Sequence, residues 1–514
     1  MTSMPTGDLI ERIIHTATRQ PHSDALSATD GTTTLTWQEL AHDITRTAKY
    51  VAEHVGAGGQ VLVISDSGPR SYLHILGCLA AGAVTSVLET SAPTAVVESC
   101  RDAVNPSLTL TPDHTIPPTD SPGAHTTATE MSALPPVDRS QAAILLFTSG
   151  TTGTPKGVTL PLHSFLAIPD LIRENGLNWI TWDDHDTTYT PLPSSHIGGL
   201  WWILNGLAHG CHTITGHSTQ SPTTVINRWA ITTTCTVPAM MNHLAEDIRA
   251  GRMPATLRLV VYGGSRAMVD DVATIESTGA RTAQIYGLSE TGCTALCLPT
   301  GPGSLDLVAR GSVGTPYPGI GIRIIADPTA TPATTINTDR TGTLWIATPA
   351  RMLGYYGQPR KTAETLVDGW INTGDIVEID DDGFVYLRGR VSELIICGGA
   401  NVSPDDVDSL ARTIPGVADA ACFAVPDDDF GAVVGVAVVA DKGHDPTALC
   451  RDIAAQFRAH AKSEARPALI VVVDDLPRTA SGKIRRSELT RMYAATSPNH
   501  TTPPTTTTSS TTPH

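Results

Sequence analysis

A glycine- and threonine-rich segment that follows an apolar run is the first part of the sequence with a composition suited to chemistry. Residues 148–158 read TSGTTGTPKGV, and the preceding residues 144–147 have the length and composition of a buried strand. Glycines let backbone N–H groups turn inward, and hydroxyls and a lysine add hydrogen bonds and positive charge around a polyphosphate. The segment predicts a phosphate-binding loop, with a Thr/Gly-rich surface loop as the alternative.

The spacing of this segment differs from two well-known phosphate-binding patterns. A Walker loop requires G-x-x-x-x-G-K-[ST], whereas Lys156 follows Pro155 and precedes Gly157. The Rossmann pattern G-x-G-x-x-G is also missing from residues 148–158. Phosphate chemistry at this loop therefore follows another design.

Two later segments also carry groups suited to chemistry. Residues 263–267 (GGSRA) follow an apolar run and differ from the serine-hydrolase elbow G-x-S-x-G only at Ala267, so a hydrolase is a rival interpretation. Residues 286–291 (YGLSET) include Glu290, and a carboxylate suits a Mg²⁺ ion that also binds phosphates. The alternative for Glu290 is an exposed acid in a turn.

The loop at 148–157 resembles the signature loop of the adenylate-forming superfamily, which includes acyl-CoA synthetases, luciferase and the adenylation domains of peptide synthetases. Four further motifs of that family follow in order, at 286–291, 373–375 (TGD), 389–390 (GR) and 477–483 (PRTASGK). The resemblance covers almost the whole chain. It implies an enzyme that uses ATP and Mg²⁺ to convert a carboxylic acid into an acyl-adenylate, and then transfers the acyl group to a thiol.

The resemblance also implies roles for individual residues. Lys483 is expected to neutralise charge during adenylation, while Glu290 and the hydroxyl of Thr151 are expected to hold Mg²⁺. Asp375 is expected to accept hydrogen bonds from both ribose hydroxyls, as an ionised carboxylate can. The residues expected to bind ATP or AMP are Thr148, Ser149, Gly150, Thr151, Thr152, Gly153, Lys156, Gly264, Ser265, Tyr286, Gly287, Ser289, Asp375 and Arg390.

For the transfer step, the resemblance implies that a small C-terminal domain rotates about a hinge at Ser392, where the family usually has Asp or Lys. The rotation replaces Lys483 with a loop that carries Gly398 and Gly399, which are expected to bind CoA because glycines let the pantetheine arm pass close to the backbone. CoA is the expected acceptor. The alternatives are the phosphopantetheine thiol of a carrier protein, and a non-catalytic nucleotide-binding relative.

The acid substrate is less constrained by the sequence. Residues 193–199 (PSSHIGG) resemble the P-L-F-H-x-x-G segment of acyl-CoA ligases, with two serines in place of the usual apolar pair. His196 is expected to be catalytic and to lie beside the acyl group, with a structural histidine as the alternative. Gly263 and Trp201 are expected to line the acyl pocket, although Trp201 and Trp202 fit the packing of a helix equally well.

An amino-acid substrate is disfavoured, because the nearest acidic residues, Asp184 and Asp186, precede this segment in a polar loop. Aromatic, succinylbenzoate-like and medium-chain aliphatic acids all remain candidates.

The elements that position these motifs alternate between helix and strand. Residues 36–39 (TWQE) form a capping box that opens a helix, residues 61–65 form a buried strand, and residues 73–84 form an apolar helix. Such alternation predicts parallel sheets covered by helices, an α/β fold. By resemblance, the large N-terminal domain has stacked α/β sheets and a distorted barrel, and a small mobile α/β domain follows. The expected boundaries are 1–389, 390–494 and a disordered Thr/Pro/Ser tail at 495–514.

The composition of the sequence restricts the classes of partner that we expect and the cellular compartment. The net charge of -17 disfavours nucleic acid as a partner, and no apolar run is long enough to span a membrane. The first residues lack the basic and apolar runs of a signal peptide, and the 9 cysteines are scattered, which is typical of reduced thiols. We therefore expect a cytoplasmic protein.

Overall fold

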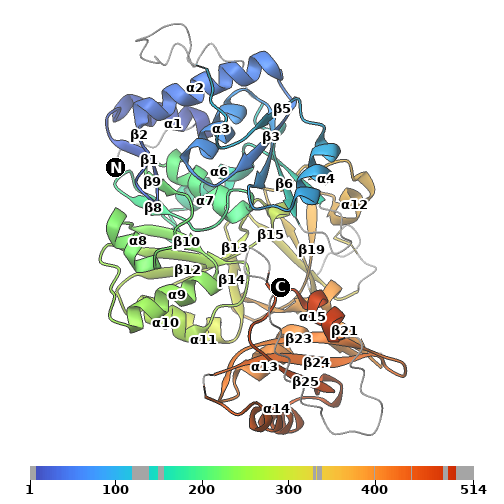
Figure 1. Ribbon diagram of the computed structural model, residues 1–514. Coiled ribbons are helices and arrows are strands. Elements are labelled where there is room, and N and C mark those ends of the chain that lie inside the picture. Colours follow the sequence, from blue (N-terminus) through green and yellow to red (C-terminus); the bar gives the residue numbers. More distant parts are fainter. Residues whose placement is uncertain are drawn as a thin grey trace.

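The computed structural model describes residues 7–117, 138–148, 156–327, 331–332, 339–398, 400–441, 443–478 and 484–493, apart from the side chains of Ser392 and Asn401. Figure 1 shows a large N-terminal part and a smaller part below it that is built from the end of the chain. The expected α/β fold class is confirmed. The domain boundaries remain predictions, and the tail at 495–514 lies outside the described residues.

A 6-stranded sheet occupies the N-terminal side of the large part. Its central strands are parallel and almost fully buried, which explains why their sequences are apolar runs without alternation. In spatial order the strands are β17 (Gly354–Tyr355), β7 (Lys156–Pro161), β6 (Ala142–Thr148), β4 (Val84–Glu89), β3 (Gln60–Ser65) and β5 (Leu108–Leu110).

A 14-stranded sheet forms the rest of the large part. Strands β1, β9, β8, β10, β11 and β12 pair in parallel, and the pairings from β12 onward to β15 are antiparallel. In spatial order the strands are β15 (Gly321–Ile325), β16 (Thr341–Ala347), β19 (Trp370–Ile379), β20 (Val385–Arg390), β14 (Ser312–Pro316), β13 (Leu296–Pro299), β12 (Arg281–Tyr286), β11 (Leu259–Gly263), β10 (Thr233–Thr236), β8 (Thr187–Tyr189), β9 (His212–Thr215), β1 (Asp24–Ala28) and β2 (Thr34–Thr36), with β18 (Leu366–Val367) beside β19.

Helix α7 (Ile197–Ala208) lies in the interior of the large part, together with α6 (Ser164–Glu174) (Figure 1). Its residues from 199 to 208 are all buried, as expected for a helix that is apolar on every side. The other helices of this part are α1 (Leu9–Arg19), α2 (Trp37–His54), α3 (Pro69–Ala80), α4 (Thr94–Val104), α8 (Pro222–Trp229), α9 (Pro238–Arg249), α10 (Val269–Glu276), α11 (Ser304–Ala309) and α12 (Pro359–Thr365).

The start of α2 agrees with the sequence prediction, whereas the ends of α3 differ from it. The capping box at Thr36 and Glu39 is present at the start of α2. The helix expected at 73–84 instead begins at Pro69, because proline is well suited to the first helical turn and Gly68 precedes it as the N-cap. It ends at Ala80, and Gly82 then turns the chain with a φ of 69° into β4.

The C-terminal part contains a 5-stranded sheet and packs against the large part through α13. Arg266 donates a hydrogen bond of 2.6 Å to the hydroxyl of Ser409 across this contact. Within the described ranges, no helix is long and apolar enough to cross a membrane. The elements are β21 (Ile395–Cys397), β22 (Ala400–Val402), α13 (Pro404–Arg412), β23 (Val417–Asp427), β24 (Gly431–Ala440), α14 (Pro446–His460), β25 (Leu469–Val473) and α15 (Arg486–Tyr493).

Candidate active site

The candidate residues of the large sheet gather at the carboxyl edge of its parallel strands. The segment that leads to His196 follows β8, Gly264 and Ser265 follow β11, and Tyr286 ends β12. Because these strands run in the same direction, the residues that follow them lie at one edge of the sheet. This is the edge at which open α/β sheets bind their ligands.

Tyr286, Asp375 and Arg390 form a hydrogen-bonded cluster in which Tyr286 and Asp375 are buried and Arg390 is partly exposed. The Tyr286 hydroxyl donates to Oδ2 of Asp375 over 2.6 Å, and Nε of Arg390 donates to Oδ1 over 2.5 Å. Asp375 and Arg390 are cross-strand partners on β19 and β20, so the sheet register brings them together. Three residues that were expected to bind the nucleotide are thus in contact.

The charge states of this cluster follow from burial and from Asp375. Burial, and then the negative charge of Asp375, raise the pKa of Tyr286 well above its usual value, so its hydroxyl remains a donor. Burial lowers the pKa of Arg390, but Asp375 outweighs this effect and raises it, so Arg390 remains a cation. A carboxylate offers about four lone-pair sites. The contacts to Tyr286 and Arg390 therefore leave Asp375 able to accept further hydrogen bonds from a ligand.

A second cluster forms around Glu290 in the short 3₁₀ helix η1 (Ser289–Thr291). The hydroxyl of Tyr355 donates to Oε1 of Glu290 over 2.7 Å, and Nζ of Lys156 lies 5.8 Å from the centre of the Tyr355 ring. Strand β17 carries Tyr355 and pairs with β7, which begins at Lys156. A carboxylate and a lysine are thereby held close to the point where the predicted phosphate loop rejoins the sheet.

Tyr355 was not among the expected site residues. Burial, followed by the charge of Glu290, raises its pKa, so the phenol remains a donor to that carboxylate. The sequence around it (Gly354-Tyr355-Tyr356) contains two neighbouring tyrosines and no acid, and nothing local identifies which ring contacts Glu290. The contact arises from strand pairing over a separation of 65 residues.

Two of the candidate glycines lie where the backbone is crowded. A Cβ atom at Gly287 would lie 2.3 Å from the carbonyl oxygen of Cys293, and one at Gly263 would lie 2.5 Å from that of Ile285. Neither position tolerates a side chain without displacement of the backbone. Packing alone therefore explains why glycine occupies both positions, and their roles at the nucleotide and the acyl group remain predictions.

His196 and Trp201, which were expected to lie beside the acyl group, differ in how deeply they are buried. His196 is the partly exposed N-cap of α7. Trp201 is fully buried on the same helix, with its ring centre 5.5 Å from that of Trp182 and 6.2 Å from that of Trp202. Trp201 therefore packs in the core around α7, and its predicted place in the acyl pocket remains untested.

Several expected residues lie outside the described part of the chain, namely Ser149, Gly150, Thr151, Thr152, Gly153, Gly399 and Lys483. Thr148 ends β6 opposite Lys156, and its hydroxyl donates to the Lys156 carbonyl over 3.4 Å. Ser392 lies in a 3₁₀ helix at residues 391–393, directly after β20. Gly398 has a φ of 57°, a conformation that favours glycine, and its N–H donates to the carbonyl of Phe430.

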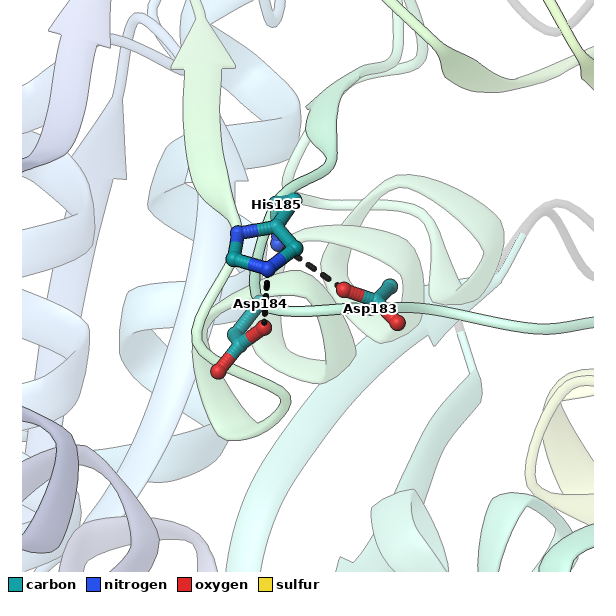
Figure 2. A group of neighbouring side chains, drawn as sticks. All are labelled: Asp183, Asp184 and His185. Carbon is teal, nitrogen blue, oxygen red and sulfur yellow. Dashed lines mark hydrogen bonds and ion pairs between the residues drawn. The ribbon is translucent and has the colours of Figure 1, made fainter. Parts of the chain in front are cut away.

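An acidic group at the opposite edge of the sheet does not belong to this site. Figure 2 shows Asp183, Asp184 and His185 side by side in the loop before β8. Asp184 is already paired with Arg19 over 3.2 Å, and the side chain of His185 is 92% exposed. Exposed groups of this kind are common without a metal ion, so Glu290 remains the predicted ligand of Mg²⁺.

Comparison with sequence families gives two matches. The profile described as AMP-binding enzyme matches residues 13–356, and that described as AMP-binding enzyme C-terminal domain matches residues 406–483. The first match includes Tyr286, Glu290 and Tyr355, and the second spans most of the C-terminal part. Asp375 and Arg390 lie between the two matched ranges.

Individual relatives agree with these matches. The chain is 43% identical to fatty acid–[acyl-carrier-protein] ligase MmaC of Mycobacterium marinum, over 95% of this chain and 98% of that protein. It is 43% identical to medium/long-chain-fatty-acid–[acyl-carrier-protein] ligase FadD10 of Mycobacterium tuberculosis, over 96% and 97%. The structure resembles ATP-bound MatB from Rhodopseudomonas palustris with a TM-score of 0.80 and 23% identity, over 95% and 99% of the two chains, and this likeness bears on the fold alone.

Proposed function

The chain belongs to the family of AMP-binding enzymes and is an adenylate-forming ligase, and we propose that it activates a fatty acid with ATP and transfers the acyl group to the phosphopantetheine thiol of an acyl carrier protein. The hydrogen-bonded Tyr286–Asp375–Arg390 cluster is the observation that carries the nucleotide step. The choice of acid and acceptor draws on MmaC and FadD10, which align with nearly the whole chain at 43% identity.

In the first step, Asp375 binds the ribose of ATP. Its remaining lone pairs accept hydrogen bonds from the two ribose hydroxyls, and Tyr286 and Arg390 fix the orientation of the carboxylate. Because Tyr286 and Arg390 both lie on strands, the Asp375 carboxylate is already oriented before the nucleotide binds. This reduces the entropic cost of nucleotide binding.

The phosphates of ATP extend towards Glu290 and Lys156. Glu290 is suited to bind Mg²⁺ with the oxygen that Tyr355 leaves free, and the bound ion would neutralise charge on the phosphates. Lys156 places a cation beside the loop at 149–153, which is proposed to bind the leaving pyrophosphate. Lys483 is proposed to approach the carboxylate and the α-phosphate, so that the carboxylate oxygen attacks phosphorus and pyrophosphate departs.

In the second step, a thiol attacks the carbonyl carbon of the acyl-adenylate and AMP departs. The arm that carries this thiol is the same pantetheine unit in CoA and in a carrier protein, so Gly398 and Gly399 suit either acceptor. CoA is the second candidate, because the chain is also 30% identical to 2-succinylbenzoate–CoA ligase of Geobacillus kaustophilus over 73% of this chain and 76% of that protein. The higher identity to MmaC and FadD10 favours the carrier protein.

The test measures the two half-reactions separately. Pyrophosphate release is followed with ATP, Mg²⁺ and a panel that includes saturated fatty acids from hexanoic to octadecanoic acid, succinylbenzoate and benzoate. The best acid is then offered with CoA or with a carrier protein bearing phosphopantetheine, and products are identified by mass spectrometry. The carrier protein without its phosphopantetheine arm is the control.

Acylation of the carrier protein through its arm supports the proposal, and exclusive formation of acyl-CoA supports the second candidate instead. Release of pyrophosphate with aromatic acids but not with fatty acids overturns the proposed substrate. Absence of acid-dependent pyrophosphate release across the whole panel overturns the proposed function.

A further inference from the structure

The carboxyl edges of the two sheets meet in a buried polar network that the nucleotide site does not use. Ser65 ends β3 and Ser67 follows it, Glu89 ends β4, and Ser194 and Ser195 lie between β8 and His196. The hydroxyls of Ser65 and Ser194 lie 2.6 Å apart, and the N–H of Ser194 donates to the hydroxyl of Ser67 over 2.9 Å. These contacts join the 6-stranded sheet to the segment that carries His196.

Glu89 is the acceptor at the centre of this network. Its Oε1 accepts hydrogen bonds from the hydroxyl of Ser67 over 3.3 Å, the hydroxyl of Ser194 over 3.4 Å and the N–H of Ser195 over 3.2 Å. Its Oε2 lies 3.9 Å from Nε2 of His217, which follows β9. With a side-chain exposure of 13%, Glu89 has exchanged most of its hydration for these contacts, so their loss would leave a buried charge with few partners.

Ser67 holds its place in the network at the expense of backbone strain. Its φ of 60° lies in the left-handed region, which costs a serine on the order of 1 kcal/mol. In this conformation its hydroxyl lies between Glu89 and the backbone of Ser194, and the contact to Ser194 is buried while that to Glu89 is partly buried. The strained backbone conformation of Ser67 therefore helps to hold the segment at 193–196 in position.

The network fixes the residue that precedes α7. The N–H of His196 donates to the carbonyl of Pro193 over 3.1 Å, and the carbonyl of His196 accepts from the N–H of Leu200 in the first turn of the helix. Ser194 and Ser195 lie between these two points, and both are bound through their backbone N–H groups. The orientation of His196 at the carboxyl edge of the sheet therefore depends on the contacts that Ser194 and Ser195 make to Ser67 and Glu89.

We propose that Glu89 is a positioning residue for acid binding, which acts through Ser194 and Ser195 to orient His196 towards the acid. This inference rests on the proposed function, since it assumes that His196 lies beside the acyl group. It also explains the serine at position 194, where the family usually has an apolar residue, because the Ser194 hydroxyl contacts both Ser65 and Glu89. Ser195 contacts Glu89 through its backbone N–H. Glu89 itself needs no contact with the substrate.

The test compares the KM for the acid with the KM for ATP in the full-length enzyme. Glu89→Ala is expected to raise the KM for the best fatty acid on the order of tenfold, because small displacements of a substrate-positioning group are costly, and to leave the KM for ATP within about twofold. Glu89→Gln keeps an acceptor oxygen for the Ser195 N–H and should restore the acid KM to within about threefold of the original value. Glu98→Gln, at an exposed position on α4, is the control.

Ser67→Gly keeps the test decisive if Glu89→Ala fails to fold. Glycine adopts a φ of 60° without strain, so this variant should retain the melting temperature while it loses the hydroxyl that binds Glu89 and Ser194. A raised acid KM with an unchanged ATP KM is expected again.

Two results would overturn the inference. One is a wild-type acid KM in folded Glu89→Ala and Ser67→Gly enzymes, and the other is an equal change in both KM values. Failure of the proposed function is a different outcome, because the unaltered enzyme itself would then release no pyrophosphate with any acid.

Discussion

Asp186 and Asp375 are two buried aspartates with almost the same exposure, 5% and 4%, and each forms an ion pair with an arginine. Asp186 lies just before β8, at the amino edge of the large sheet, and Asp375 meets Tyr286 at the carboxyl end of β12. Neither burial nor the type of partner distinguishes a structural ion pair from a candidate binding site.

The number of donors around each carboxylate does distinguish them. Asp186 accepts from Nε of Arg258 over 2.8 Å, from the hydroxyl of Thr232 over 2.6 Å and from the N–H of Asp183 over 2.8 Å, and a second nitrogen of Arg258 also donates to it. These contacts occupy the roughly four lone-pair sites of a carboxylate. Among the described residues, the carboxylate of Asp375 accepts hydrogen bonds only from Tyr286 and Arg390, so it retains the capacity to bind a ligand.

The largest effect is expected for Asp375→Asn. The amide replaces the carboxylate that we propose accepts from the two ribose hydroxyls, and it leaves Arg390 without its counter-charge, so kcat/KM for ATP should fall about 100- to 1000-fold. Acid-dependent pyrophosphate release measures the loss, and circular dichroism checks that the variant is folded. A folded variant that keeps wild-type activity would remove the distinction between the two aspartates.

Asp186→Asn should affect stability instead. It breaks a buried ion pair whose arginine is 35% exposed, so the free energy of unfolding should fall by about 2 kcal/mol, less than for a fully buried pair. The kcat and both KM values should stay within about twofold of the original. Urea denaturation measures the first quantity and pyrophosphate release the second, and a large loss of activity in a folded variant would contradict the structural role.

Tyr286→Phe removes one donor from Asp375 without changing its charge. We expect an increase of about tenfold in the KM for ATP, the effect of one hydrogen bond to a charged group, with little change in the KM for the acid. Steady-state kinetics with each substrate varied in turn make the measurement. Tyr189→Phe is a matched control, because Tyr189 is also buried and lies on β8, three strands from β12 in the sheet.

The wild-type protein and the Asp186→Asn variant should differ in how their stability depends on pH. Burial raises the pKa of Asp186, but the hydrogen bonds and charge of Arg258 outweigh this effect and hold the pKa below its ordinary value of 3.8. A lowered pKa stabilises the folded state above pH 3.8, and this contribution is lost as the pH falls through the folded-state pKa. The difference in urea midpoint between wild type and Asp186→Asn should therefore be constant above pH 3.8 and shrink below it.

The smallest effect is expected for Asp184→Asn. Its carboxylate faces solvent and Arg19, and such surface ion pairs contribute about 0–1 kcal/mol. Activity and its dependence on Mg²⁺ concentration should stay within about twofold of the original. A shift in the Mg²⁺ requirement would show that the group at Asp183, Asp184 and His185 binds a metal that matters for activity.

The sequence alone predicted the features that depend only on residues close together in the chain. The capping box at Thr36 and the strand at 61–65 both follow from neighbouring residues, and the structure contains both. The α/β class followed in the same way from alternating helix and strand patterns. Helix ends were less certain, as α3 shows, because Pro69 extended the helix beyond the apolar run.

Contacts between distant residues could not be predicted in this way. The departure at Ser194 was visible in the sequence, but its partner Glu89 lies 105 residues away on another sheet. Tyr355 and Glu290 meet only because β17 pairs with β7. Trp201 was equally compatible with a pocket wall and with helix packing, and only the three-dimensional arrangement places it in the core.

The sequence by itself thus determined the reaction class, since the groups predicted to bind phosphate, metal and ribose lie in short motifs whose residue types suit that chemistry. The tertiary structure decided which carboxylates remain available for ligands. Asp186 and Asp375 have the same side chain, and the difference between them arises from the donors that strand order and register place around each one. Such neighbours depend on how the whole chain packs, which no local segment specifies.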